Sequence, residues 1–153
     1  MAPLITLTTD FGTADPYVAE MKGVLAQLGP ADLRVFDLSH ELPAFDVQAA
    51  ALFLRSAVPR FPPGTIHVVV VDPGVGSERA PIVVALRDQW LVGPDNRVFG
   101  YLYDGSERVH VVDPARAVTA PLSGTFHGRD LFAPVAARLA AGVPVDEFAA
   151  PCE

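Results

Sequence analysis

Short apolar runs alternate with longer amphipathic stretches along the whole chain. Short apolar runs bounded by turn residues are typical of strands, whereas apolar positions repeating every 3.6 residues predict helices. The pattern predicts strands over residues 3–9, 33–38, 65–71, 81–86, 89–92 and 109–112, and helices over 15–28, 46–58 and 128–141. Strands and helices alternate, and residues 65–71 form a continuous apolar strand of the kind covered on both faces. We therefore predict one α/β domain over residues 1–153, with a mainly parallel sheet sandwiched between helices.

Residues at the ends of the predicted elements support these boundaries. Asp15 is placed to cap the first helix, with Pro16 at its first helical position. Asp46 is placed to cap the second helix, which Pro59 would end. The strands over 81–86 and 89–92 are separated only by Arg87-Asp88, so we predict that they pair as a hairpin.

Composition restricts the setting and the kind of ligand. The formal net charge is −7 and Lys22 is the single lysine, which argues against nucleic-acid binding and is compatible with a cationic ligand. Cys152 is the single cysteine, so a disulfide framework is excluded and a reducing cytoplasm is the expected location. No apolar run is long enough for a membrane helix, and we expect no membrane partner.

Polar residues gather where the predicted strands end. In open α/β sheets, ligands bind at the carboxyl ends of the strands, so these loops predict a site. Single loops of this kind also arise from turns and helix caps, but several at one edge favour a ligand site. The residues concerned are Asp10 and Asp15 after the first strand, Asp37, His40 and Asp46 after the second, Asp72 and Arg79 after the third, and His127, Arg129 and Asp130 before the last helix.

Common motif chemistries fit this set poorly. Gly74 and Gly76 form a G-x-G, but neither the third glycine of a dinucleotide fold nor the Gly-Lys-Ser/Thr of a phosphate loop follows. Asp72, His127 and another carboxylate could ligate a metal, yet no H-x-x-x-H or paired-cysteine spacing is present, and we expect no metal. A Ser-His-Asp hydrolase would need a G-x-S-x-G elbow, which is absent. The remaining interpretation is a site in which a carboxylate, a guanidinium and an imidazole surround a small organic ligand.

Five motifs occur in order: TTDFGTADPYVAEMKGV, DLSHELPAFDV, VDPGVGSER, GPDN and FHGRDLFAPVAARLA. Together they resemble the N-terminal domain of the S-adenosyl-L-methionine (SAM) hydroxide adenosyltransferases, relatives of the fluorinases and chlorinases. The resemblance implies that water attacks C5′ of SAM, giving adenosine and L-methionine without a cofactor, in a homotrimer. It also implies that Asp72, Arg79 and His127 handle the water.

The same resemblance implies a set of substrate-binding residues. It places Asp10 on the ribose hydroxyls, and Asp15 and Tyr17 near the methionine end. Phe45 and Phe126 are expected against the nucleoside, with ordinary core packing as the less favoured alternative. The full set that the resemblance assigns to substrate is Asp10, Asp15, Tyr17, Phe45, Phe126 and Gly128.

Two departures from the family pattern keep other functions open. Arg97 stands where the family usually has glycine, and a non-glycine residue is strained if the turn needs a positive φ. Family members also continue into a small β-barrel that completes the pocket of a neighbouring subunit, and we expect this chain to lack it. The alternatives to SAM hydrolysis are halide adenosyl transfer and a non-catalytic SAM- or adenosine-binding domain. Halide-using relatives lack the residues seen here as Asp72 and His127, which favours hydrolysis.

Overall fold

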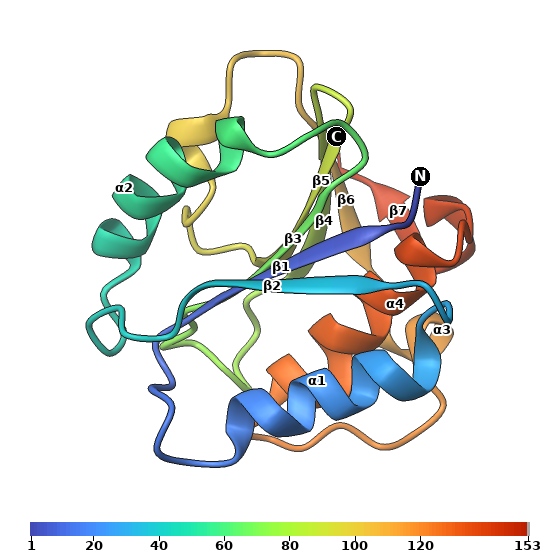
Figure 1. Cartoon of the computed structure of the whole chain (residues 1–153), viewed down its shortest axis with the longest axis horizontal. Helices are drawn as coiled ribbons and strands as arrows, with labels where there is room; N and C mark the ends of the chain where they lie inside the picture. Colours follow the sequence, from blue (N-terminus) through green and yellow to red (C-terminus); the bar gives the residue numbers. More distant parts are fainter. Residues whose placement is uncertain (153) are drawn as a thin grey trace.

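A computed structural model describes residues 1–152, which fold around one seven-stranded sheet of order β2-β1-β3-β5-β4-β6-β7 (Figure 1). The strands are β1 (Leu4–Thr9), β2 (Arg34–Ser39), β3 (Ile66–Val70), β4 (Pro81–Leu86), β5 (Gln89–Pro94), β6 (Arg108–Val112) and β7 (Ala149–Pro151). The helices are α1 (Tyr17–Leu28), α2 (Val47–Ala57), α3 (Pro114–Ala117) and α4 (Ala133–Ala140). Turns of 3₁₀ helix span Val58–Arg60, Gly100–Leu102 and Val145–Glu147, and a π-helical turn, Gly128–Phe132, leads directly into α4. Within residues 1–152, no helix combines the length and the apolarity needed to cross a membrane.

The sheet is mixed rather than mainly parallel. β1 pairs in parallel with β2 and β3, and β3 pairs in parallel with β5. β4 is antiparallel to β5 and β6, and β7 adds an antiparallel strand that the hydrophobic pattern does not predict. The prediction of a mainly parallel sheet was therefore wrong for the second half of the sheet. There the two-residue connection between β4 and β5 permits only antiparallel pairing.

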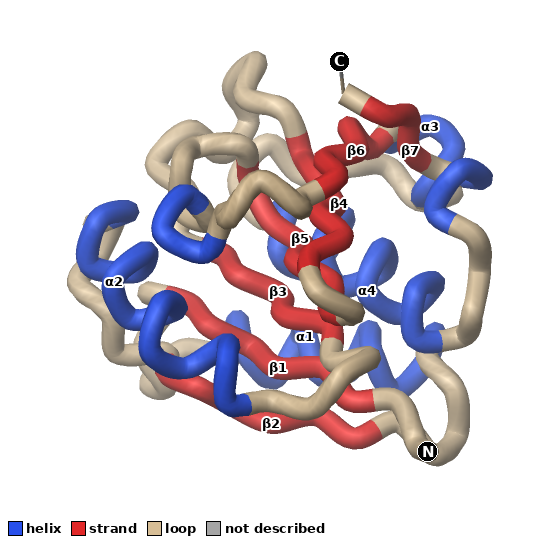
Figure 2. Tube along the Cα trace, turned by 90° about the horizontal axis from the view of Figure 1, so that it is seen from above, coloured by secondary structure: helices blue, strands red, loops and turns tan. Residues whose placement is uncertain are grey.

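Helices cover both faces of the sheet, as the α/β class requires. Figures 1 and 2 show α1 and α4 on one face and α2 on the other. Val68 and Val70 of β3 pack into the core beneath α1 and α4, whereas Val69 and Val71 pack into the core beneath α2. All five residues of β3 are buried, which confirms the prediction of a strand covered on both faces.

The predicted helix caps had different outcomes. The carboxylate of Asp46 accepts a hydrogen bond of 2.9 Å from the amide of Ala49, which confirms it as the cap of α2. The prediction for Asp15 was wrong, because α1 begins at Tyr17 with Pro16 in the capping position and without a side-chain cap. A helix that begins one residue later places Asp15 before the cap, where its carboxylate no longer meets the first free amides.

The predicted hairpin between β4 and β5 is confirmed. Residues 81–86 pair with 89–94, and the two connecting residues Arg87 and Asp88 have φ values of 47° and 65°. Two successive positive φ values match the turn type whose twist suits a two-residue hairpin. Arg97, at the departure from the family pattern, also has a positive φ of 72°. The strain expected from an arginine at that turn is therefore present.

Candidate active site

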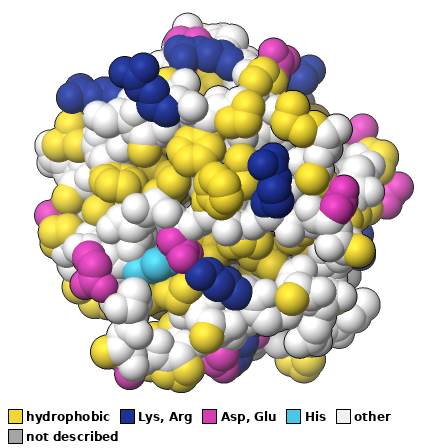
Figure 3. Space-filling view, viewed as in Figure 1, with side chains coloured by type: hydrophobic (Ala, Val, Ile, Leu, Met, Phe, Trp, Pro, Cys, Tyr) yellow, Lys and Arg dark blue, Asp and Glu magenta, His cyan; other side chains and the backbone are white. Residues whose placement is uncertain are grey.

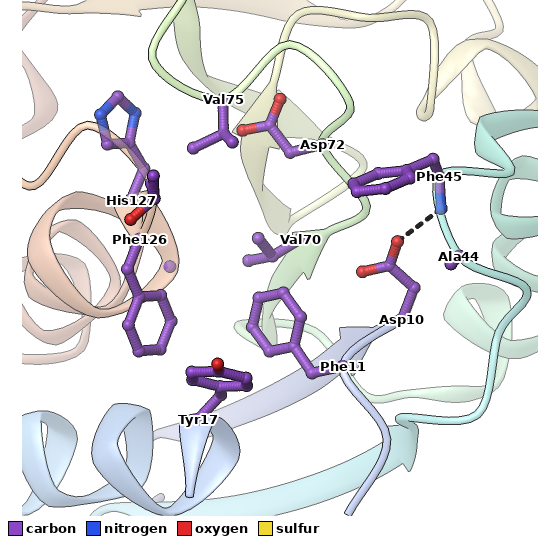
Figure 4. Close-up of a pocket in the computed structure, with 12 residues that line it drawn as sticks. Asp10, Phe11, Tyr17, Ala44, Phe45, Val70, Asp72, Val75, Phe126 and His127 are labelled. Carbon is purple, nitrogen blue, oxygen red and sulfur yellow. Dashed lines mark hydrogen bonds between the residues drawn. The ribbon is translucent and has the colours of Figure 1, made fainter. Parts of the chain in front are cut away.

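A pocket of about 430 Å³ opens at the carboxyl ends of β1 and β3 (Figure 4). The two strands are parallel neighbours, and Thr9 pairs with Val70, so the residues that follow them emerge at the same edge. Of the nine residues that the family resemblance assigns to water or substrate, seven line this pocket: Asp10, Tyr17, Phe45, Asp72, Phe126, His127 and Gly128. Residues that the sequence reasoning did not assign to the site complete the lining: Phe11, Ala44, Val70, Val75 and Thr125.

Asp72, Arg79 and His127 form one connected group. The Nε of Arg79 lies 3.0 and 3.1 Å from the two carboxylate oxygens of Asp72, and its second nitrogen, Nη2, also donates to Oδ2. The same Nη2 lies 2.9 Å from Nδ1 of His127. The side chains of Asp72 and Arg79 are only 4% and 9% exposed, so water screens their ion pair weakly.

Arg79 occupies the middle of this group, behind the pocket wall. Asp72 and His127 line the pocket, whereas Arg79 bridges them from the protein side. Its guanidinium also lies over the ring of Phe132, 5.4 Å from the centroid. The three residues that the family resemblance assigns to the water thus lie together, but Arg79 does not itself line the pocket.

The surroundings of His127 favour the neutral imidazole. Burial lowers the pKa of His127, the positive charge of Arg79 lowers it further, and the carboxylate of Asp72 acts in the opposite direction. A guanidinium can only donate, so Nδ1 of His127 accepts from Arg79. In the neutral ring the proton is therefore on Nε2.

Gly76 allows the loop that carries Asp72 to approach the loop that carries His127. Its φ is +77°, and a Cβ atom there would lie 2.3 Å from the backbone oxygen of Gly124. Neither the conformation nor the space suits any residue with a side chain. The absence of a side chain at Gly76 therefore lets these two loops lie in contact.

Asp10 joins two loops at the opposite side of the pocket. Its Oδ2 accepts a hydrogen bond of 2.7 Å from the amide of Phe45, and Figure 4 shows the other carboxylate oxygen turned toward the pocket. Phe45 has a φ of 60° and is 64% exposed, so it is not an ordinary core residue. Asp10 and Phe45 are therefore placed to contact a ligand together.

Three aromatic rings form one wall of the pocket. Phe11, Tyr17 and Phe126 pack edge to face, with centroids 5.4 to 6.0 Å apart. Figure 4 shows the three side chains gathered on one side of the cavity. Phe11 was not among the predicted site residues, although its position directly after Asp10 in the TTDFGT motif was an available signal. Asp15 is exposed and does not line the pocket.

No three His, Cys, Asp or Glu side chains gather into a possible metal-binding group anywhere in residues 1–152.

A family model, the SAM hydroxide adenosyltransferase N-terminal domain, matches residues 5–149. The chain belongs to this family. The resemblance inferred from the five ordered motifs is thereby confirmed, and the pocket lies within the matched residues.

Relatives of the chain differ in how similar they are to it. The (R)-S-adenosyl-L-methionine hydrolase of Salinispora arenicola is 48% identical over 149 residues, covering 94% of this chain and 55% of that protein. The protein of the same name from Thermus thermophilus is 45% identical over 154 residues, covering 94% and 59%. A fluorinase from an Actinoplanes species is 24% identical over 170 residues, covering 95% and 57%. The chain thus spans little more than half the length of these relatives.

Solved structures share the fold of the chain. An uncharacterized conserved protein from Thermotoga maritima matches with a TM-score of 0.90 at 36% identity, covering 97% of this chain and 59% of that one. A conserved hypothetical protein from Thermus thermophilus matches with a TM-score of 0.80 at 39% identity, covering 100% and 59%. The α/β architecture is therefore that of known structures.

Proposed function

We propose that this chain supplies the nucleoside-binding domain of an enzyme that hydrolyses SAM to adenosine and L-methionine. The observation that carries the proposal is one pocket that holds Asp72 and His127, linked through Arg79, together with Asp10. The names of the relatives at 43–48% identity support it.

The proposed reaction is a displacement at C5′. The water oxygen forms a bond to C5′ as the bond from C5′ to sulfur breaks, and the electron pair of that bond stays on sulfur. Methionine leaves as a neutral thioether, so the leaving group needs no general acid. A sulfonium and a hydroxide-like nucleophile lose charge as they react, so a dry site favours the transition state. The reaction consumes only SAM and water, and we assign no cofactor.

The geometry suggests a role for each member of the water-handling group. Asp72 accepts a hydrogen bond from the attacking water in the resting arrangement, because the Nδ1 lone pair of His127 is already engaged by Arg79. His127 accepts the water proton at Nδ1 when Nη2 of Arg79 releases that nitrogen and stays bonded to Asp72. Its lowered pKa keeps the ring neutral for that step at neutral pH.

The remaining lining residues suit the organic parts of SAM. We assign Asp10 to the ribose hydroxyls, and Phe45, Phe126 and Gly128 to the nucleoside. Tyr17 is assigned to the methionine end together with Asp15, which lies outside the pocket in this domain. An acidic chain with formal charge −7 is compatible with a cationic substrate.

We also propose that the enzyme is a homotrimer that works in the cytoplasm. Tyr17 and Phe45 are 44% and 64% exposed at the pocket, as expected where another protein surface completes the site. Further apolar side chains are spread over one face of the domain (Figure 3). Sedimentation equilibrium should detect self-association, and a strict monomer at high concentration would count against it. The single cysteine supports a reducing compartment.

The test of this function is to incubate the chain with SAM, with and without chloride or fluoride. Chromatography then detects adenosine, methionine and any halogenated nucleoside. Adenosine and methionine should appear in equal amounts, whether halide is present or not. A halogenated nucleoside would instead establish halide transfer, and binding of adenosine without turnover would establish a binding domain.

Substitutions distinguish the water-handling group from loop residues. Asp72→Ala and His127→Ala should each lower turnover by about 10²–10⁴-fold, with smaller effects on SAM affinity. Asp88→Ala, at the exposed tip of the β4–β5 hairpin, is the control. If adenosine production stays near wild type in both pocket variants, the assignment is wrong.

A further inference from the structure

A chain of hydrogen bonds lies behind the loop that carries Asp10. The carboxylate of Asp37 lies 2.7 Å from Nζ of Lys22 and 2.7 Å from Nε2 of His40. Nδ1 of His40 lies 2.8 Å from Oγ1 of Thr9. His40 is 6% exposed and Thr9 is fully buried. None of these four side chains lines the pocket, and the proposed reaction does not use them.

The donor and the acceptor can be assigned for each of these hydrogen bonds. Burial acts to raise the pKa of Asp37, but hydrogen bonds from His40 and Lys22 outweigh it and lower the pKa, so Asp37 is an acceptor. His40 therefore donates from Nε2, and in the neutral ring Nδ1 accepts from the hydroxyl of Thr9. The oxygen of Thr9 is then able to accept a further hydrogen bond.

A backbone amide of the loop after Asp10 donates that hydrogen bond to Thr9. The amide of Phe11 donates to Oγ1 of Thr9 over 3.2 Å, and the amide of Gly12 donates to the backbone carbonyl of His40 over 2.6 Å. His40 thus holds the loop through both its side chain and its backbone. Asp10 lies between the end of β1 and these two hydrogen-bonded amides. The two bonds therefore hold the segment that presents Asp10 to the pocket.

The loop after β2 is attached to the same point. His40 follows β2 directly, and the chain then runs to Phe45, whose amide donates to Asp10. The loops after β1 and β2 are therefore joined twice, once at His40 and once at Asp10. With His40 buried and bonded at both ring nitrogens, its position is determined by β1 and β2 rather than by solvent.

We propose that His40, acting through Thr9, is a positioning residue that sets the place of Asp10 for binding ribose hydroxyls. The inference rests on the proposed function only in taking Asp10 as the ribose ligand. Loss of His40 leaves the carboxylate of Asp10 present but allows its loop to move. The expected result is weaker nucleoside binding without loss of the fold.

Two measurements test this proposal, namely adenosine binding by calorimetry and residue-resolved amide exchange. His40→Ala and Thr9→Val should weaken adenosine binding roughly 3- to 10-fold and speed exchange of the Phe11 amide by a similar factor. His40→Asn retains a polar group near the Nδ1 position and should recover more binding than His40→Gln. The matched control is His110→Ala, which removes another buried histidine, 8% exposed, on the distant strand β6.

A double variant separates positioning from general destabilisation. Adding His40→Ala to Asp10→Ala should weaken binding no further than Asp10→Ala alone, because His40 acts through Asp10. Additive losses would overturn the proposal, as would Thr9→Val and His40→Ala variants that match wild type in either measurement. If the wild-type chain binds no adenosine, the proposed function fails, and the exchange of the Phe11 amide alone decides whether His40 holds the loop.

Discussion

Replacing Gly76 with alanine should separate the two loops that bring Arg79 to His127. Gly76 lies in the turn between Asp72 and Arg79, with its backbone facing the carbonyl of Gly124. An added Cβ would lie 2.3 Å from that oxygen. Because both partners are fixed to the backbone, no side-chain rotation can relieve the clash, and one loop must move.

The size of the effect follows from the geometry. Restoring an ordinary contact of 3.4 Å or more requires a displacement of roughly 1 Å, and a misplacement of that size can lower a rate by about 10²-fold. The positive φ of +77° adds a penalty of about 1–2 kcal/mol for any side chain. We expect Gly76→Ala to lose about 2–4 kcal/mol of unfolding free energy in total, with overpacking supplying the rest.

The control variant is Gly142→Ala, which shares the penalty of positive φ but not the clash. Gly142 has a φ of +83°, a Cβ added there would meet no atom within 4 Å, and the residue lies after α4, away from the pocket. The difference between the two variants in urea unfolding therefore isolates the contact with Gly124. Adenosine production from SAM should fall only in Gly76→Ala.

Titration of His127 by NMR reports the loop movement directly. Burial and then the positive charge of Arg79 lower the pKa of His127, so withdrawal of the guanidinium should let the pKa rise toward its ordinary value. Gly142→Ala should leave it unchanged. Equal stability losses in the two glycine variants, together with an unaltered His127 pKa in both, would refute the reasoning.

Two further predictions concern stability. Burial lowers the pKa of His67 to about 4, with Gln89 acting in the opposite direction. Since the folded pKa lies below the unfolded value, the stability tied to neutral His67 is complete above about pH 6.5 and falls by about 3 kcal/mol as the pH approaches 4. Urea unfolding across this range should show a shallower decline in His67→Gln, and parallel curves would contradict the prediction. Arg97→Gly should raise the unfolding free energy by about 0.5–1 kcal/mol, because glycine relieves the strain of φ 72°. Arg108→Gly, within β6, should lower it, and a loss in both variants would argue against strain at Arg97.

Local features of the fold were predictable because they depend on neighbours in the chain. Apolar runs specified β3 and the hairpin of β4 and β5, and Asp46 signalled the start of α2 through its capping carboxylate. The five motifs likewise placed His127 in one group with Asp72 and Arg79, although His127 lies 48 residues beyond Arg79 in sequence. That inference came from resemblance to a family, since spacing alone cannot show that two distant loops meet.

Tertiary structure decided everything that depends on contacts across the fold. The sequence pattern does not contain the antiparallel addition of β7 or the later start of α1, because strand partners and helix ends are selected by packing. It also does not contain the hydrogen bond from Arg79 to His127, which decides the tautomer of the neutral ring. That bond joins two loops that meet at Gly76 and Gly124. The sequence by itself determined which chemical groups the domain possesses. Only packing between loops from different strands determined which of their atoms face the pocket, because hydrogen-bond geometry is set by distances that no linear spacing encodes.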